Sequence, residues 1–149
     1  MRILLACSSG GHLRQLAVLK PWWSKHERHW MTFDTADALS ILADEDTTWA
    51  YHPTARNIPN LVRNLGRTLK VLRRFKPDVI VSTGSAIAVP LFFWAKLLGI
   101  RTVFIEVYDR IDNATLSARI VRPITDLFLV QWEEQQKLYK GSVVAGRLL

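Results

Sequence analysis

The sequence predicts an α/β protein, with a Rossmann-like parallel sheet and helices on both of its faces. Short apolar stretches rich in Val, Ile and Phe alternate along the chain with stretches of helical period, a pattern typical of parallel sheets. Hydrophobic residues make up 49% of the 149 residues, which favours a folded protein over a disordered one. The length fits one domain over residues 1–149.

Each expected element has its own marker. The strands are short apolar runs between turn or polar residues, and the helices repeat apolar residues at helical spacing. Pro21 ends the first helix, and Gly99 closes the fourth. Strands are expected at residues 3–7, 29–33, 47–51, 78–82, 102–107 and 126–131, and helices at 13–19, 36–43, 58–75, 86–98, 114–124 and 133–139. Such sheets bind ligands at the carboxyl ends of their strands.

The first candidate site is the stretch Ser8-Ser9-Gly10-Gly11, which joins the first strand to a helix. Glycines allow a tight turn and close ligand approach, and a helix start offers free N–H groups to an anion. We expect Ser9, Gly10 and Gly11 to bind a phosphate or diphosphate, with His12 beside them as a donor or base. The alternative is a plain turn with a serine N-cap, and the fingerprint G-x-G-x-x-G is absent.

The same pattern recurs after the fourth strand, where Thr83, Gly84 and Ser85 precede a helix. Because parallel strands end at one edge of the sheet, both turns are expected to face one ligand. Glu106, near the end of a buried strand, needs a partner or a function, since burial of an unpaired carboxylate is unfavourable. We expect it either to pair with Arg110, or to bind hydroxyls or act as a base in a cleft.

Two other residues at strand ends have simpler interpretations. Cys7 is expected to be a small core residue; as the one cysteine of the chain it excludes an internal disulfide and fits a reducing compartment. Asp34 could contact a ribose in a dinucleotide site. An N-cap for the helix that begins near Ala36 is the preferred interpretation of Asp34.

The chain is basic, with a formal charge of +7 and a pI of about 10, so anionic partners are expected. Residues 47–77 contain no acidic residue. On the helix in this segment an apolar face should pack on the sheet, and a cationic face should meet an anionic membrane surface. The apolar residues are Ile58, Leu61, Val62, Leu65, Leu69 and Leu72, and the cationic ones are Arg63, Arg67, Lys70 and Arg74. Trp22 and Trp23 are expected in the core, with lipid headgroups as the alternative.

Longer motifs occur in a characteristic order: "SSGGHL", "KPDVIVSTGSAIAVP", "FIEVYDRI", "TLSARIVRPITDLFLVQWEEQ" and "GRLL". On these motifs nearly the whole chain resembles the acceptor-side subunits of split GT-B glycosyltransferases, which are related to MurG. That family includes the membrane-recruiting subunit of the eukaryotic UDP-GlcNAc transferase acting on GlcNAc-PP-dolichol, and bacterial PssD-type proteins. The most specific stretch is "DLFLVQWEE" with the preceding "TLSARIVRPI".

The resemblance implies the N-terminal, acceptor-binding half of a GT-B enzyme, with a separate subunit that binds the UDP-sugar. The acceptor would be a polyprenyl-diphosphate-linked sugar whose diphosphate docks near the two glycine turns and basic residues. His12 or Glu106 would help to deprotonate the acceptor hydroxyl, without a cofactor or metal. The residues facing the partner subunit would be Trp132, Val143, Val144, Leu148 and Leu149. A final edge strand and frayed tail is the alternative for residues 143–149.

Three other function classes stay open. A module that only recruits its catalytic partner to the membrane would need neither His12 nor Glu106. A nucleotide-cofactor oxidoreductase would use the first glycine turn and Asp34, although its fingerprint is broken. Nucleic-acid binding through the basic helix lacks a recognised motif, so no nucleic acid is expected as a partner.

Membrane attachment is expected to be peripheral. No signal peptide is visible, and Thr83-Gly84-Ser85 and Pro90 interrupt the long apolar run at residues 79–95. The sequence also shows no N-terminal anchor like that of the eukaryotic family member. We therefore expect a cytoplasmic protein held on the inner face of the cytoplasmic membrane by its basic helix, its aromatics or the lipid acceptor.

Overall fold

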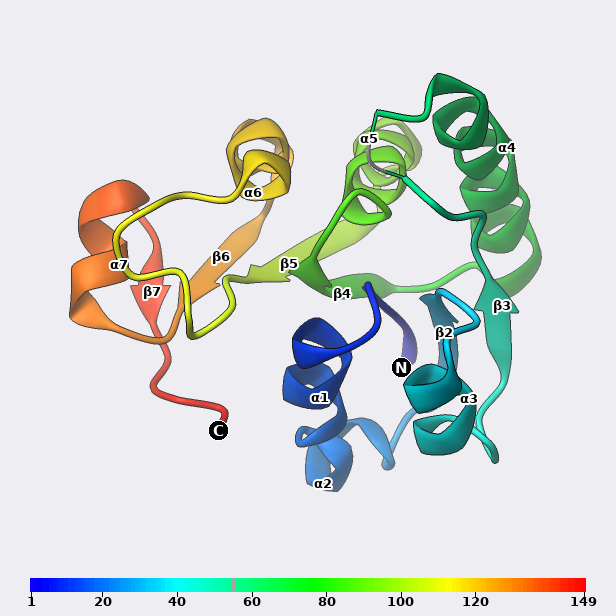
Figure 1. Cartoon of the computed structure of the whole chain (residues 1–149), viewed down its shortest axis with the longest axis horizontal. Coiled ribbons are helices and arrows are strands. Elements are labelled where there is room, and N and C mark those ends of the chain that lie inside the picture. Colours follow the sequence, from blue (N-terminus) through cyan, green and yellow to red (C-terminus); the bar gives the residue numbers. More distant parts are fainter. Residues whose placement is uncertain (55) are drawn as a thin grey trace.

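Seven parallel strands form the sheet of the computed structural model, which describes residues 1–54 and 56–149. They are β1 (Arg2–Cys7), β2 (Glu27–Thr32), β3 (Thr47–Trp49), β4 (Val79–Gly84), β5 (Arg101–Ile105), β6 (Leu127–Val130) and β7 (Val143–Val144). Their order is β3-β2-β1-β4-β5-β6-β7, and all neighbours are parallel (Figure 1). The fold class expected from the sequence is confirmed, with its order reversal between β1 and β4.

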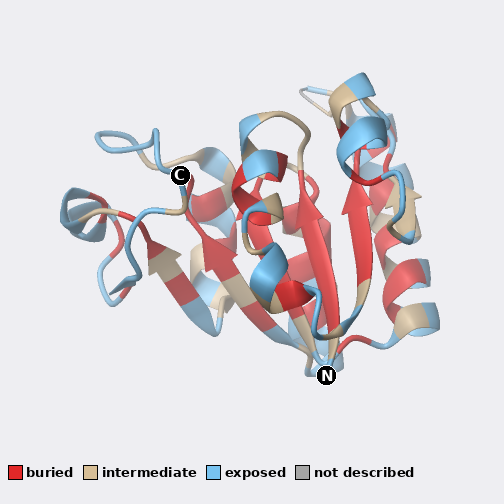
Figure 2. Cartoon of the chain, turned by 90° about the horizontal axis from the view of Figure 1, so that it is seen from below, coloured by how far each residue is buried: buried red, intermediate tan, exposed pale blue. Residues whose placement is uncertain are grey.

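Helices lie on both faces of the sheet (Figure 1). One face carries α1 (Gly11–Ala17), α2 (Lys20–Trp23) and α3 (Ala36–Ile41); the other carries α4 (Ile58–Phe75), α5 (Ala88–Leu98) and α6 (Leu116–Val121). A 3₁₀ turn (Arg122–Ile124) and α7 (Glu133–Leu138) follow. Each face has its own buried apolar layer, and the strands between them are the most buried part of the chain (Figure 2).

The helix α2 was not expected from the sequence. Pro21 does not simply end the preceding helix but lies in the first turn of α2, where proline is tolerated because that N–H has no helical partner. Trp23 is buried and its Nε1 donates to the carbonyl of Leu16 (3.1 Å), which confirms the expected core position. Trp22 is half-buried against the same core layer.

The long helix α4 turns a different side to the sheet from the one its apolar pattern indicates. Ile58 and Val62 are 72% and 61% exposed, and Leu61 is exposed as well. Leu65 and Leu69 are half-buried, and Leu72 alone of the expected apolar face is fully buried. The expectation that this face packs on the sheet is therefore wrong for the N-terminal half of the helix.

Hydrogen bonds explain why α4 buries polar side chains instead. Asn64 accepts a hydrogen bond from the Tyr51 N–H (2.8 Å) and donates one to the Tyr51 carbonyl (2.9 Å). Asn60 donates to the carbonyl of Pro53 (2.8 Å), and Thr68 donates to the carbonyl of Leu65. The bonds of the two asparagines satisfy the backbone of the β3–α4 connection, so both are buried at little cost.

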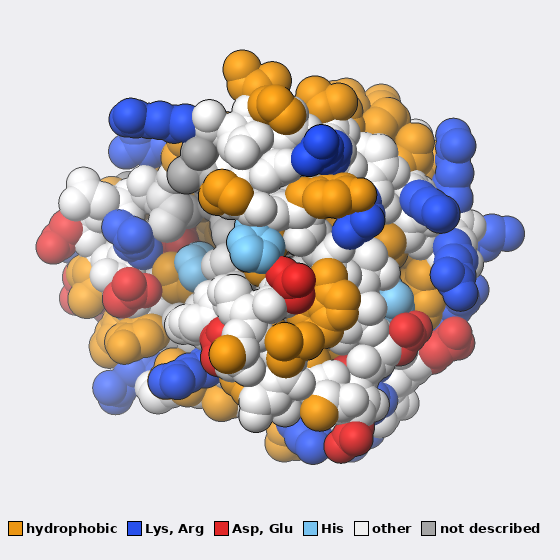
Figure 3. Space-filling view, turned by 45° about the vertical axis from the view of Figure 1, so that its right-hand side comes forward, with side chains coloured by type: hydrophobic (Ala, Val, Ile, Leu, Met, Phe, Trp, Pro, Cys, Tyr) orange, Lys and Arg blue, Asp and Glu red, His pale blue; other side chains and the backbone are white. Residues whose placement is uncertain are grey.

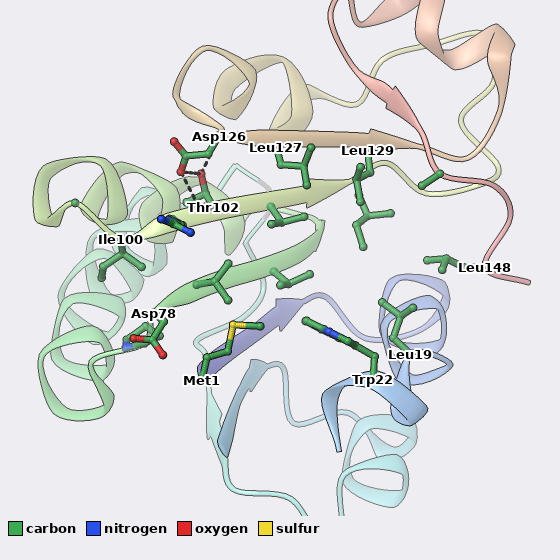
Figure 4. A pocket seen from close by; sticks show the side chains of 18 of the residues that line it. Met1, Leu19, Trp22, Asp78, Ile100, Thr102, Asp126, Leu127, Leu129 and Leu148 are labelled. Atoms are coloured by element: carbon green, nitrogen blue, oxygen red, sulfur yellow. Dashed lines mark hydrogen bonds between the residues drawn. The ribbon is translucent and has the colours of Figure 1, made fainter. Parts of the chain in front are cut away.

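One part of the sheet is covered on one face only. Between α2 and the C-terminal tail (residues 145–149), side chains of β4, β5 and β6 line an apolar groove of about 970 Å³. Figure 4 shows Trp22 on one side of this groove, Leu127 and Leu129 on the other, and Leu148 of the tail at its border. Parallel sheets are usually covered on both faces, but no described residue covers this apolar groove.

Candidate active site

The two glycine turns are joined directly at the carboxyl ends of β1 and β4. The ring Nδ1 of His12 lies 2.6 Å from the carbonyl oxygen of Thr83, and the Thr83 hydroxyl donates to the carbonyl of His12 (2.9 Å). Gly84 has a φ of +103°, and a Cβ there would lie 3.0 Å from the Phe104 ring and 3.5 Å from the His12 ring. The close approach of the two turns therefore requires glycine at position 84.

The contact with Thr83 fixes the tautomer of His12. A carbonyl oxygen only accepts hydrogen bonds, so Nδ1 of His12 carries a proton, and in the neutral ring Nε2 then keeps its lone pair. No side chain or carbonyl in the described part of the chain bonds to that Nε2, and the residue is half-buried in the first turn of α1. A neutral imidazole held in this way can accept a proton from a hydroxyl.

A carboxylate from α3 holds the first glycine turn. The N–H of Gly10 donates to Oδ2 of Asp37 (2.7 Å), and the Thr35 hydroxyl donates to Oδ1 (2.6 Å). These two hydrogen bonds lower the pKa of Asp37. The Gly10 N–H, expected to meet a diphosphate, is therefore already occupied, whereas Gly11 is exposed and Ser9 half-buried. Sequence reasoning missed Asp37, although an acid placed early in the helix after β2 was its signal.

The second glycine turn is mostly closed. Thr83 and Gly84 are buried, and the Thr83 hydroxyl is committed to His12, so this side chain orients His12 rather than facing solvent. Ser85 has a φ of +92° and its N–H donates to the Ser117 hydroxyl (3.3 Å). The Ser85 hydroxyl is buried without a hydrogen-bond partner among the described residues. It is the free polar group of this turn.

Glu106 is fully buried and has partners other than the expected Arg110. Its Oε1 accepts from the Val107 N–H (3.0 Å), and its Oε2 accepts from the hydroxyls of Thr115 (3.3 Å) and Tyr139, the latter in a very short contact. Burial raises the pKa of Glu106, and the hydrogen bonds partly offset that rise. Tyr139 was not anticipated, because nothing in the sequence shows that α7 returns to the end of β5.

Three buried glutamines connect the site to the end of the chain. Gln15 of α1 accepts from the Tyr108 N–H (3.1 Å) and from the Gln131 side chain (2.6 Å). Gln131 also donates to the Glu106 carbonyl (3.0 Å) and accepts from the Leu148 N–H (2.9 Å). Gln135 binds the backbone on both sides of this cluster. The tail, the loop after β5 and α1 are thus hydrogen-bonded together.

The remaining strand-end residues have structural positions. The expectation that Asp34 caps α3 is wrong: the N-cap position belongs to Thr35, and Asp34 instead accepts from Nε2 of His52 (2.6 Å). Cys7 is buried, and burial raises the pKa of its thiol to about 12, so it is an unreactive core residue. Within the described residues no three His, Cys, Asp or Glu side chains gather into a metal-binding set.

Of the residues after β6, only Ala145, Gly146 and Leu148 are among the described residues that line the apolar groove. Trp132 is half-buried, its Nε1 donates to the Tyr108 carbonyl (2.7 Å), and the guanidinium of Arg147 lies 5.0 Å from its ring centre. Val143 and Val144 form the edge strand β7. Val143, Val144 and Leu149 are exposed, whereas Leu148 packs into the groove.

The four expected cationic side chains of α4 fall into two pairs with different surroundings. Arg67 donates to the carbonyl of Trp49 and to the Tyr51 hydroxyl (2.8 Å), and Arg63 lies over the Tyr51 ring. Lys70 and Arg74 line a polar cavity between α4 and β3. In Figure 3, Lys and Arg side chains (blue) lie along the right-hand flank of the molecule, beside exposed apolar side chains (orange) in the region of α4 and α5. Across residues 1–54 and 56–149, no helix has both the length and the apolar character to cross a bilayer.

Comparison with known sequences confirms the resemblance that the motifs indicate. Residues 51–148 match the family model described as "Oligosaccharide biosynthesis protein Alg14 like". The UDP-N-acetylglucosamine transferase subunit ALG14 of Homo sapiens is 29% identical over 183 residues, covering 100% of this chain and 83% of the human protein. The corresponding subunit of Rattus norvegicus is 33% identical over 180 residues, covering 99% of this chain and 82% of the rat protein.

Comparison with solved structures shows the same fold at low sequence identity. MurG of Acinetobacter baumannii superposes with a TM-score of 0.73 and 15% identity, over 90% of this chain and 43% of MurG. S. aureus MnaA, solved with UDP, gives 0.79 and 14%, over 99% of this chain and 45% of MnaA. The chain therefore spans less than half the length of these proteins.

Proposed function

Because the chain belongs to the Alg14 family of oligosaccharide biosynthesis proteins, we propose that it is the acceptor-binding subunit of a two-component glycosyltransferase. Its relatives are named as subunits of a UDP-N-acetylglucosamine transferase. In this proposal a second subunit holds the UDP-sugar, and the acceptor is a polyprenyl-diphosphate-linked saccharide. The chain covers 43% of MurG and 45% of MnaA, so it corresponds to one part of these longer proteins.

The observation that carries the proposal is the pair of hydrogen bonds between His12 and Thr83. They lock the ring with Nδ1 protonated, so Nε2 is the proton acceptor. In the proposed step Nε2 takes the proton of the acceptor hydroxyl, the hydroxyl oxygen bonds to the sugar C1, and the C1–O bond to UDP breaks. Glu106 is enclosed by Tyr139 and Thr115, so we assign it to holding the loop after β5 and not to proton transfer.

We assign the acceptor diphosphate to the rim of the two joined turns. The unpartnered hydroxyl of Ser85 and the exposed backbone of Gly11, with Ser9 beside it, support this assignment. Asp37 already binds the Gly10 N–H, and its negative charge disfavours an anion at that one position. We therefore assign the diphosphate contact that was expected at Gly10 to Ser9 and Gly11.

The donor-binding subunit is proposed to dock on the C-terminal border and to cover the apolar groove. The floor of the groove is a face of β4, β5 and β6 that the described residues leave uncovered, whereas parallel sheets are usually covered on both faces. Val143, Val144 and Leu149 extend this apolar surface beyond the groove. An apolar core of this kind with a polar rim is typical of stable protein interfaces.

The membrane contact is proposed at the layer of α4, α5 and α6. Exposed apolar side chains gather there, and these three helices contain no acidic residue. Those that are most exposed are Ile58, Leu61, Val62, Phe93, Leu97, Leu98, Leu116 and Ile120. Apolar side chains with cations beside them suit the interface of an anionic leaflet, here the inner face of the cytoplasmic membrane.

Reconstitution with a donor-binding partner tests the function. Sugar transfer to a polyprenyl-diphosphate acceptor is measured for the wild-type pair, for His12→Ala and for the control His26→Ala, whose residue lies before β2 at the amino end of the sheet. Loss of a proton acceptor lowers kcat by about 10²–10⁴-fold, and the control variant keeps its rate. If the His12→Ala variant binds the partner and transfers sugar at the wild-type rate, the chain is instead a recruitment module. This is the second candidate function, and the burial of Glu106 away from any acceptor favours it.

A further inference from the structure

A second cavity lies at the amino ends of the strands, away from the joined glycine turns. It has a volume of about 600 Å³ and is bordered by the C-terminal half of α4 and the edge strand β3. Arg2 at the start of β1 and Phe75 at the end of α4 belong to its wall. The glycine turns follow the carboxyl ends of β1 and β4, so this cavity is a separate place on the molecule.

The wall of this cavity carries an excess of positive charge. Four cationic residues line it, and Asp46 is the one acidic residue among the lining residues. The cationic residues are Arg2, Arg67, Lys70 and Arg74. Lys70 and Arg74 are neighbours on one face of α4 and are exposed, and neither has a hydrogen bond or ion pair with the described residues. Arg2 is already engaged: its Nε lies 3.3 Å from Oε1 of Glu27, and its guanidinium lies over the Phe75 ring.

The one carboxylate of the wall is already engaged. Oδ2 of Asp46 lies 2.8 Å from Nδ1 of His29, whose Nε2 lies 2.8 Å from the Thr48 hydroxyl. Asp46 is thereby held toward β2 and does not pair with Lys70 or Arg74. The dipole of α4 stabilises cations in the last turn of the helix, such as Arg74. Its effect does not extend to Lys70, which lies before that turn. Among the described residues, the charges of Lys70 and Arg74 are thus left without a partner.

We propose that this cavity binds a phosphoryl group, carried either by a small soluble ligand or by a lipid headgroup. Lys70 and Arg74 bind its oxygens from α4. The volume lies within the range of small-molecule sites and is far larger than a single phosphate needs. Binding here does not depend on the proposed transferase activity, so each can fail without the other.

The test measures binding to the full chain without a partner subunit. The amide signals of Thr47 and Thr48 are followed by NMR while pyrophosphate is added at about 0.15 M salt, which screens weak surface attraction. In parallel, binding to vesicles of neutral phosphatidylcholine is compared with binding to vesicles that also contain phosphatidic acid. Saturable shifts at Thr47 and Thr48 with pyrophosphate indicate a soluble phosphorylated ligand. Binding that requires phosphatidic acid and is lost in the Lys70→Gln, Arg74→Gln variant indicates a headgroup.

The matched control removes the same charge elsewhere on the same face. Lys70→Gln with Arg74→Gln should weaken binding at least about tenfold, because two charge-assisted contacts are lost. Lys96→Gln with Arg119→Gln, on α5 and α6, should leave the affinity for pyrophosphate unchanged. The exchange Lys70→Arg with Arg74→Lys should retain binding. Equal losses in both Gln pairs, or no saturable binding to either probe, would overturn the proposal.

Discussion

The side-chain amide of Gln131 donates a 2.6 Å hydrogen bond to Oε1 of Gln15, although 116 residues separate the two in the chain. Both side chains are buried. Through this bond α1, which carries His12, is connected to the end of β6. The side-chain oxygen of Gln131 also accepts a hydrogen bond from the Leu148 N–H, so α1 is connected to the tail as well. The arrangement of the candidate site therefore depends on the end of the chain.

Replacing Gln131 by leucine should destabilise the protein strongly. The substitution removes the acceptor of the Leu148 N–H and the side-chain donor to both Oε1 of Gln15 and the Glu106 carbonyl, in a buried place, so we expect a loss of about 2–4 kcal/mol in the free energy of unfolding. Urea denaturation measures it. The control Lys137→Ala, at an exposed position of α7, should change the value by less than about 0.5 kcal/mol. Similar values for the two variants would contradict the network.

Gly84 should not tolerate alanine. Its φ of +103° and the 3.0 Å distance from a Cβ to the Phe104 ring both oppose a side chain, and we expect a loss of about 1–3 kcal/mol. The control is Gly66→Ala on α4, where nothing lies within 4 Å and φ is ordinary; there alanine should stabilise by about 0.5–1 kcal/mol. Thermal unfolding of both variants measures the contrast in sign.

Glu106 should make the stability depend on pH. Burial raises its pKa above the ordinary 4.5, so the folded protein holds this proton more tightly than the unfolded chain does. The contribution of Glu106 to stability is therefore fully present below about pH 4.5 and falls as the pH rises toward the folded-state pKa. Glu106→Gln lacks this titration, so the stability of the wild type relative to this variant should decrease with rising pH.

Chemical denaturation at several pH values between about 4 and 7 tests this expectation. Glu134→Gln, at an exposed position in the first turn of α7, is the matched control and should show no such slope. If the wild type instead becomes more stable than Glu106→Gln as the pH rises, the folded protein lowers the pKa of Glu106, and the expectation is wrong.

Asp37 should have the opposite pH dependence. Its hydrogen bonds with Thr35 and Gly10 lower its pKa below the ordinary 3.8, so its stabilising contribution is present above that value and is lost as the pH falls through the folded-state pKa. Asp37→Asn should speed amide exchange at Gly10 at neutral pH. Asp44→Asn removes the same charge from an exposed position and should leave the exchange of Gly10 unchanged.

The fold was predictable because the pattern that determines it is local. Each strand is a short apolar run, and its neighbours in the chain are helices, so a parallel sheet with ligand-binding turns at one edge follows. The junctions at Gly10 and Gly84 could be placed at that edge for the same reason, and the structure brings them into contact.

The rest depended on contacts between distant segments. Asn60 and Asn64 look like surface residues on a helical wheel, yet both are buried because they bind the backbone of the β3–α4 connection. Glu106 finds Tyr139, which lies 33 residues further along, instead of the nearby Arg110. Apolar periodicity contains no information about such hydrogen bonds, so the buried side of α4 and the partners of Glu106 could not be derived from it.

Met1 and Leu148 both belong to the wall of the apolar groove. Affinity tags or fluorescent proteins fused to either terminus would begin at the rim of the surface assigned to the donor-binding subunit, and would compete with it for space. Labels for assembly measurements are therefore better attached at an exposed position on the far flank, for example at Arg73 of α4 through a cysteine exchange.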